Sequence, residues 1–292
     1  MLENALESIK YVGIAAATEI VVVDGAEDFR VAELAKRFGT TLISGHDLGI
    51  YDAWNKGIAV ARGEVIGFLN DDDQYLPGVV GCLSSFLQSG HDVLSGVALR
   101  ADHQPCDNPQ QVMPHEIGLL NVVGSPNAIN ARFFRREIIN ILPAFDETLR
   151  IWGDKAWLAE MYFLRPSTLL CPEAIYFYRT HAESLTLGRA ENRSALGIER
   201  IDALTRLRAK ATLSMWSRAA VRFWLDLAHA HEILAALRMK TELTRRPDGG
   251  FLLWGIRTGL WLVLMGLPLI VHRRHIVQRR RGSRNRSTTR VR

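Results

Sequence analysis

The chain has 292 residues, of which 48% are hydrophobic and 23% are charged, so it is long enough for a large folded domain and too apolar to be disordered throughout. Its formal net charge is +5, but nine arginines and no acid lie between residues 272 and 292, which leaves the remainder mildly acidic. The basic balance therefore does not identify the folded part as a nucleic-acid-binding domain. Three widely spaced cysteines, Cys82, Cys106 and Cys171, form no C-x-x-C pair, which argues against a zinc knuckle or thioredoxin-like site and suits a reducing compartment.

The first 90 residues alternate between predicted helices and predicted strands. Apolar residues recur at helical spacing in four segments, 2–12, 29–38, 50–61 and 76–88. Apolar, β-branched runs separate them at 19–24, 40–44 and 65–69. This alternation predicts an α/β fold with a doubly wound, mostly parallel sheet. The first helix is polar and is not a secretory signal, so we expect the bulk of the protein to stay in the cytoplasm.

The rest of the chain is more mixed. Strands are predicted over 93–99 and 174–178, and helices over 133–140, 155–164 and 191–237. The last of these helices is long and arginine-studded, with no chemical motif. An apolar run at 251–271 has the length of a membrane span, which needs roughly 20 residues. The arginine-rich end that follows it is expected to be disordered.

Two predicted strands end in acid. Asp24 follows E-I-V-V-V, and Asp71, Asp72 and Asp73 follow V-I-G-F-L-N. Ligands of open α/β sheets bind beyond the carboxyl ends of strands, and a Mg²⁺ or Mn²⁺ ion there would offset three adjacent carboxylates and bridge substrate phosphates. The triplet could instead be a solvated turn, and Asp24 could either contact a nucleobase or ribose or cap the helix that begins at Phe29. Neither a Walker loop nor G-x-G-x-x-G is present.

The segment D-L-G-I-Y-D-A-W-N-K-G-I-A-V-A-R-G-E-V-I-G-F-L-N-D-D-D-Q-Y, residues 47–75, resembles the family 2 inverting glycosyltransferases of GT-A fold. Four shorter motifs share the resemblance: V-V-V-D-G-A-E-D (21–28), F-F-R-R-E (133–137), F-D-E-T-L (145–149) and Y-R-T-H-A-E-S-L (178–185). It implies a GT-A-like domain over residues 1–188 that lacks the family's usual first strand. It also implies metal-assisted transfer of a sugar, with inversion, from a nucleotide-diphosphate sugar to a glycan or lipid-linked acceptor, as in bacterial polysaccharide biosynthesis.

The resemblance assigns roles to individual residues. Asp73 is expected to coordinate Mg²⁺ or Mn²⁺ directly, together with Asp71. Arg179 could pair with phosphate oxygens, and His181 could approach the metal or the phosphate. The full set implied for the donor site is Asp24 (on the nucleobase), Asn55, Lys56, Gly63, Asp71, Asp72, Arg179 and His181.

Asp154, in W-G-D-K-A-W-L, stands where the family has its general base. A base must lie within hydrogen-bond reach of the attacking hydroxyl, on the side opposite the leaving diphosphate. Asp154 could also cap the helix predicted over 155–164, a role compatible with catalysis, and Asp146 is the rival candidate for the base.

The apolar run at 251–271 has arginines on both flanks, and this favours a cytoplasmic location for both ends of the run. A re-entrant or interfacial segment, bent at its glycines and at Pro268, fits this better than one straight span, and a buried core helix is the alternative. We expect four regions: the glycosyltransferase-like domain (1–188), a helical region (189–245), a membrane-associated segment (246–271) and an arginine-rich tail (272–292) that would attract anionic lipid. This organisation predicts a location on the cytoplasmic side of the cell membrane.

A second class of function stays open, namely a non-catalytic GT-A relative that binds nucleotide sugar or scaffolds a membrane complex for glycan assembly. The expected lack of a first strand favours this class, whereas Asp71, Asp73 and Asp154 favour the enzyme. In both cases the predicted partners are a nucleotide-diphosphate sugar and a membrane surface, and no specific nucleic acid is expected.

Overall fold

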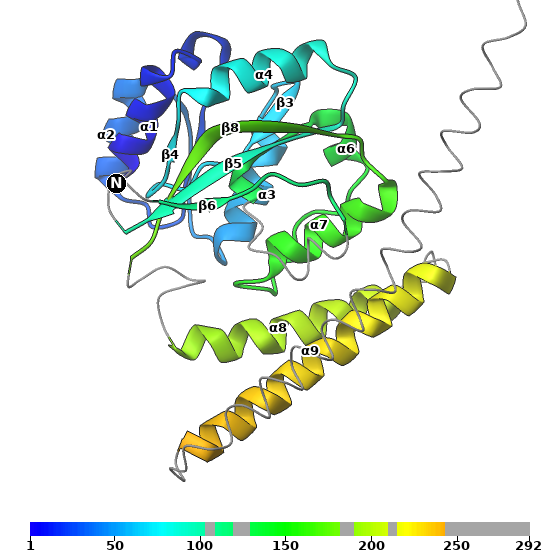
Figure 1. The fold of residues 1–292 in the computed structure, drawn as a ribbon. Helices are drawn as coiled ribbons and strands as arrows, with labels where there is room; N and C mark the ends of the chain where they lie inside the picture. The colour runs from blue at the N-terminus through cyan, green and yellow to red at the C-terminus, as the bar shows by residue number, and fades with distance from the viewer. Residues whose placement is uncertain (103–108, 119–128, 182–189, 210–214, 243–292) are drawn as a thin grey trace, which may run out of the picture. The chain divides into compact units, whose positions relative to one another are not determined.

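The computed structural model describes residues 1–102, 109–118, 129–181, 190–209 and 215–242 (Figure 1). The chain divides into two compact units, Met1–Glu232 and Ile233–Arg292, so the first unit continues past the predicted boundary at residue 188. Within the described ranges, no helix combines the length and the apolar character needed to cross a bilayer. The predicted membrane segment and arginine-rich tail lie outside these ranges.

The helices and strands follow one another along the chain, and most of them are labelled in Figure 1. They are α1 (Leu2–Tyr11), η1 (Ala15–Ala17), β1 (Val21–Asp24), α2 (Phe29–Phe38), β2 (Thr41–Ser44), α3 (Ile50–Val60), β3 (Val65–Gly67), β4 (Gln74–Tyr75), α4 (Gly78–Gln88), β5 (Val93–Ala101), β6 (Gln110–Val112), η2 (Ile129–Ala131), β7 (Arg132–Arg135), α6 (Arg136–Asn140), α7 (Gly153–Leu164), β8 (Thr168–Arg179), α8 (Ala190–Ala209) and α9 (Met215–Glu242).

The strands form two sheets. β1 and β2 pair in parallel, as the alternation of helices and strands predicted. The second sheet has the order β3-β7-β5-β8-β4, with β6 paired to β5, and only β5 and β8 are parallel. The prediction of a mostly parallel sheet is therefore wrong for this part of the fold. Two antiparallel ladders flank β7, which lies between β3 and β5 and runs against both.

Residues 133–135 belong to this antiparallel strand and not to the predicted helix, which begins only at Arg136. Phe133 and Phe134 are both buried, but they pack into different apolar clusters on opposite faces of the sheet. Neighbouring residues that are buried on opposite sides are typical of a strand. The apolar run at the start of this segment is too short to show whether its hydrophobic period is that of a strand or of a helix.

Two apolar clusters cover the faces of the second sheet. One lies under α1 and α4 and includes Val79, Phe86 and Ile175, all fully buried. The other packs α3, α6, α7 and α8 against the opposite face, with Trp157 and Leu204 in its interior. The helical region after residue 189 is thus part of the core of the first unit, because α8 contributes to the same cluster as the strands.

A disulfide between Cys82 and Cys171 joins α4 to β8, with a Cα–Cα distance of 6.0 Å. The two cysteines are 89 residues apart, so their spacing gave no sign of the pairing, and the disulfide differs from the free thiols expected in a reducing compartment. Cys106 lies outside the described residues.

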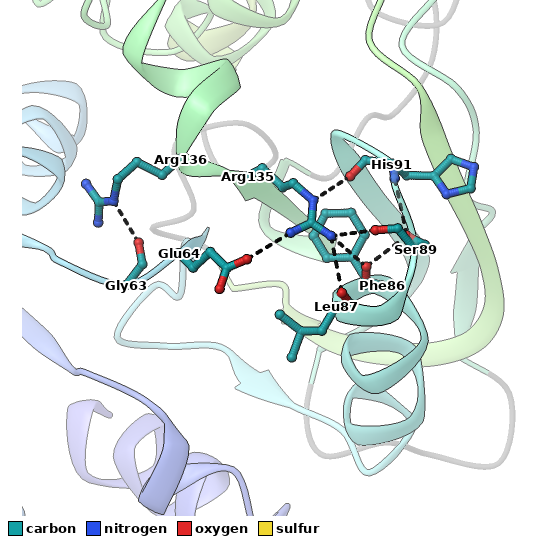
Figure 2. Close-up of polar contacts among 8 residues, drawn as sticks. All are labelled: Gly63, Glu64, Phe86, Leu87, Ser89, His91, Arg135 and Arg136. Atoms are coloured by element: carbon teal, nitrogen blue, oxygen red, sulfur yellow. Dashed lines mark hydrogen bonds and ion pairs between the residues drawn. The ribbon is translucent and has the colours of Figure 1, made fainter.

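Arg135, at the end of β7, holds the C-terminus of α4 (Figure 2). Its guanidinium donates to the carbonyl oxygens of Phe86 at 3.0 Å, Ser89 at 2.6 Å and His91 at 2.8 Å, and pairs with Glu64 at 3.1 Å. A cation at this position satisfies the helix's free carbonyls and opposes its dipole. The arginine pair of the F-F-R-R-E motif is therefore explained in part by its structural role.

Candidate functional site

A cavity of about 1640 Å³ lies between the two sheets. All residues of β1 and β3 line it, and α1 and α3 contribute further apolar walls. Among the described strands, β1 pairs only with β2 and β3 only with β7, so no strand connects the sheets across this space. The polar side chains at its mouth follow the carboxyl ends of β1 and β3, where α/β sheets bind ligands.

Asp24 ends β1 and lines the cavity, as expected of a donor-site residue. It is 7% exposed, and its carboxylate accepts hydrogen bonds from the backbone N–H groups of Ala26 at 3.1 Å and Asp28 at 2.8 Å. The helix cap before Phe29 is Asp28, whose side chain accepts from the N–H of Arg30. The alternative that Asp24 caps α2 is wrong, because its bonds shape the turn that precedes the cap.

Asp71 and Asp72 come from the loop after β3, and both line the cavity. Burial and the charge of neighbouring Asp72 raise the pKa of Asp71 above its ordinary value. His181, just beyond β8, also lines the cavity, and its Nε2 lies 2.8 Å from Oδ2 of Asp72. The structure thus brings three of the predicted donor-site residues together.

Asp73 is directed away from this group. It is 1% exposed and does not line the cavity. Its carboxylate accepts hydrogen bonds from the Tyr176 hydroxyl at 2.6 Å, the Asn70 amide at 3.1 Å and the Arg179 backbone N–H at 2.8 Å. Burial raises its pKa to about 7, against the opposing effect of these bonds. In this position Asp73 joins the aspartate loop to β8, and it is not placed as the first metal ligand that the resemblance implied.

A divalent cation is implied by the resemblance, and the described residues fit it in part. They contain no group of three or more His, Cys, Asp or Glu side chains arranged to hold a metal. Mg²⁺ and similar ions are often held by one or two carboxylates, with substrate phosphates and water completing the shell. Asp71 and Asp72 fit such a site, because both line the cavity, and burial together with the charge of Asp72 raises the pKa of Asp71.

Asp154 lies in the first turn of α7 and lines the same cavity from a different element. Trp152 is the N-cap of α7, so Asp154 does not occupy the capping position. Its Oδ1 accepts from the backbone N–H of Lys155 at 2.8 Å, and the Tyr51 hydroxyl lies 3.4 Å away. Burial raises the pKa of Asp154, and the charge of Lys155 partly opposes the rise.

Tyr51 fixes this end of α7. Its hydroxyl donates to the carbonyl oxygen of Ile151 at 3.0 Å, and its ring stacks with Phe145 at 5.8 Å between centroids. A Cβ on Gly153 would lie 2.5 Å from the ring, so the close approach of helix and ring requires glycine there. The contacts hold the carboxylate of Asp154 beside a hydroxyl in a partly apolar wall.

Four other predicted residues lie elsewhere. The Asn55 side chain bonds both backbone groups of Phe145, and Lys56 pairs with Asp52 at 3.0 Å; neither residue lines the cavity. Arg179 also lies off the cavity lining, and its backbone N–H is the group that bonds Asp73. The rival base, Asp146, pairs with Arg206 at 2.8 Å outside the cavity.

Gly63, by contrast, lines the cavity. Its carbonyl oxygen accepts from Nε of Arg136 at 2.8 Å, which ties the start of the β3 segment to α6 (Figure 2).

Glu199 is a site residue that the sequence did not reveal. Its carboxylate, on α8, accepts from three consecutive backbone N–H groups, those of Arg150 at 3.0 Å, Ile151 at 2.8 Å and Trp152 at 2.9 Å. These residues lead directly into the turn that carries Asp154, so Glu199 positions the candidate base. Glu199 and Ile151 are 48 residues apart in the sequence, and α8 carries no recognisable motif. No local sequence pattern therefore predicts this contact.

Asp47 was also missed. It lines the cavity, and a Cβ on Gly25 would overlap its carboxylate, so the two lie in close contact at the end of β1. The only signal was its place as the first residue of the segment that carried the resemblance.

Known proteins resemble this chain in sequence over residues 1–139 and in fold over a longer range. Residues 1–139 match the family described as "Glycosyl transferase family 2". No curated protein sequence matches the chain. Among solved structures, TarS 1–349 of S. aureus is similar with a TM-score of 0.54 and 18% identity, over 77% of this chain and 65% of that one. The mannosyltransferase PcManGT from Pyrobaculum calidifontis is similar with a TM-score of 0.55 and 15% identity, over 90% and 76%.

At these identities the structural likeness shows the fold alone. The chain spans just under two thirds of the length of the TarS fragment it matches.

Proposed function

We propose that the chain, whose residues 1–139 match glycosyl transferase family 2, transfers a sugar from a nucleotide-diphosphate sugar to an acceptor hydroxyl, with inversion. The observation that carries the proposal is one cavity lined both by the Asp71–Asp72 pair and by Asp154, which comes from a separate element. A single displacement requires a group that holds the leaving diphosphate and a base that faces the attacking hydroxyl.

The donor half of the cavity is proposed to contain Asp24, Asp47, Asp71, Asp72 and His181. Asp24 and Asp47, at the end of β1, would accept hydrogen bonds from the base or ribose of the nucleotide. A bound Mg²⁺ or Mn²⁺ would neutralise the diphosphate as negative charge develops on it. His181 restrains Asp72 through their 2.8 Å contact and so fixes the face of the carboxylate that is turned to the cavity.

Solved structures of similar fold support this class of ligand. TarS 1–349 has been crystallised with UDP-GlcNAc and PcManGT with GDP-Man and Mn²⁺.

Asp154 is proposed as the general base. Its carboxylate takes the proton of the acceptor hydroxyl while that oxygen bonds to the anomeric carbon and the bond to the diphosphate breaks. The raised pKa of Asp154 suits this role, because a stronger base takes the proton more readily provided that it is ionised at the working pH. Glu199 and Tyr51 hold the turn and keep the carboxylate in place.

The site of action is proposed to be the cytoplasmic face of the cell membrane, and the acceptor a glycan or lipid-linked glycan of a polysaccharide pathway. The support comes from the sequence: the apolar run at 251–271, its arginine flanks and the basic tail.

The direct test is release of nucleoside diphosphate by the full-length protein with Mn²⁺, using UDP- and GDP-sugars and a panel of glycan acceptors. Release that needs both acceptor and Asp154 supports the enzyme. A protein that binds UDP or GDP but releases none from any donor is the non-catalytic relative, a reading favoured by the withdrawal of Asp73 from the cavity.

A further inference from the structure

A second polar part of the cavity is lined by cations. Arg100 at the end of β5, Lys155 on α7 and Arg200 on α8 all line it. They come from three elements far apart in the sequence, and neither arginine belongs to a motif that carried the resemblance. The cluster is therefore a product of the fold.

The two arginines have hydrogen-bonding capacity that the described residues do not use. Nε of Arg100 and Nε of Arg200 are buried, and neither has a hydrogen-bond partner within the described part of the chain. Arg100 otherwise donates to Gln110 at 3.3 Å, and Arg200 approaches Glu232 at 3.5 Å, which is long for an ion pair that shares a hydrogen bond. Buried donors left without acceptors are costly, so an anionic ligand at this place would be favoured.

Lys155 places the cluster beside the candidate base. It directly follows Asp154 in α7. Burial lowers the pKa of Lys155, Asp154 partly offsets the effect, and the positive charges of Arg200 and Arg100 lower it further. These charges are close enough to repel one another, and a bound anion would relieve the repulsion.

The cluster reaches the candidate base, because Lys155 follows Asp154 in the chain and the charges of Arg200 and Arg100 act on it. The charges that act on Lys155 are those of Asp154, Arg200, Arg100 and Arg132, whereas the side chain that pairs with the aspartate loop is His181. The hydroxyl that loses its proton to Asp154 belongs to the acceptor. Because Lys155 is the next residue in α7, we assign a group bound to Lys155 to the acceptor as well.

We propose that Arg100, Lys155 and Arg200 bind an oxyanion, a phosphate or a carboxylate, carried by the acceptor. The proposal rests on the proposed function, since it takes Asp154 as the base. Guanidinium groups suit this task because their planar N–H pairs match the two oxygens of a carboxylate or phosphate. The acceptor is thus an anionic sugar or glycan. Its charged group lies near its reacting hydroxyl, because Lys155 directly follows Asp154 in α7.

The test compares three probes that share a ring and differ in charge: glucose 6-phosphate, glucuronate and glucose. Binding to the full-length protein is measured by calorimetry, beside UDP and GDP with Mn²⁺ as donor-side probes. We expect at least one anionic probe to bind about tenfold or more tighter than glucose, the gain of one charge-assisted contact. Arg100→Gln and Arg200→Gln should each remove most of this preference, and Arg200→Lys should keep part of it.

Arg222→Gln is the matched control, because Arg222 is an exposed arginine on α9 that pairs only loosely with Asp226 at 3.5 Å and does not line the cavity. It should leave the affinities for all probes unchanged. Circular dichroism melts of each variant show whether the fold is retained, and Arg200→Lys provides a milder substitution if Arg200→Gln does not fold.

The outcomes separate the inference from the proposed function. Equal affinity for the charged and neutral sugars overturns the inference, and UDP or GDP binding then still supports the donor site. A loss of UDP or GDP affinity in Arg200→Gln as large as the loss for the anionic sugar also overturns it, because the cations would then serve the donor diphosphate. An arginine-dependent preference for the anionic sugar in a protein that binds no nucleotide supports the anion site and rejects the proposed donor.

Discussion

The cavity has two linings of opposite charge, and each is expected to bind an anionic group of a substrate in a different way. On one side, Asp71 and Asp72 face the cavity with a histidine beside them. On the other, Arg100, Lys155 and Arg200 line it, and Lys155 directly follows Asp154 in α7. A diphosphate next to two carboxylates needs a cation between them, whereas an anion next to two guanidinium groups binds directly. The donor end of the site is therefore expected to depend on metal and the acceptor end to be independent of it.

The largest expected effect is that of removing the base from the cationic side. Asp154→Asn should lower kcat about 100- to 10,000-fold, the usual contribution of general-base catalysis. UDP or GDP affinity should stay the same, because Asp154 lies apart from the donor lining. Steady-state kinetics and calorimetry check the two halves of this prediction. Asp146→Asn is the control, and a larger loss of kcat in that variant would make Asp146 the base.

On the acidic side, Asp71→Asn should raise the Mn²⁺ concentration needed for half-maximal activity by about tenfold or more, since one of the ionised oxygen ligands is lost. Asp73→Ala is the informative partner. It should lower the free energy of unfolding by about 1–3 kcal/mol, because it leaves buried donors of Tyr176 and Arg179 unpaired. Activity titrated with Mn²⁺ and urea unfolding measure these effects. A Mn²⁺ requirement that shifts more in Asp73→Ala than in Asp71→Asn would place Asp73 in the metal site after all.

Glu199 links α8 to the cationic side. Glu199→Ala frees the three N–H groups before α7, and we expect kcat to fall about tenfold while the KM for the donor changes little. Glu199→Gln keeps one acceptor oxygen and should recover part of kcat. If the donor KM rises as much as kcat falls, then Glu199 supports the whole cavity and not the base in particular.

A smaller effect is expected in the pH dependence. Asp154 must be ionised to act, and burial raises its pKa, so kcat/KM should fall as the pH drops through a value above that of an ordinary aspartate. The charge of Lys155 opposes the rise, so Lys155→Met should move this acid limb to higher pH. A limb that stays in place or moves to lower pH in Lys155→Met would show that another group controls it.

The smallest effect on activity is expected from a change outside both linings. Arg135→Ala removes the guanidinium that holds the end of α4 and should lower the free energy of unfolding by about 2 kcal/mol or more. Below the melting temperature, its kcat, donor KM and metal requirement should match those of the wild type. A selective change in one of these constants would mean that α4 is coupled to one side of the cavity.

The sequence predicted the local elements better than their arrangement. Segments with a clear helical period, such as α2 and α3, have nearly the predicted bounds. The strand β7 was missed because a two-residue apolar pair before a helix has no period of its own, and its antiparallel partners are distant in sequence.

The site was predictable where it follows strand ends and was not where it depends on contacts between distant segments. Asp24 and Asp71, which follow the ends of β1 and β3, line the cavity. The burial of Asp73 away from the cavity depends on Tyr176, a residue 103 positions away that β8 brings beside the aspartate loop. The cations Arg100 and Arg200 likewise meet only in the folded chain.

The most direct test of the two-sided cavity is calorimetric binding of UDP or GDP and of the preferred anionic sugar to the full-length protein, each with Mn²⁺ and with EDTA. The account predicts that nucleotide affinity falls at least about tenfold on removal of Mn²⁺, while the affinity for the anionic sugar does not change. Nucleotide binding that is independent of Mn²⁺, or sugar binding that requires it, would contradict the account.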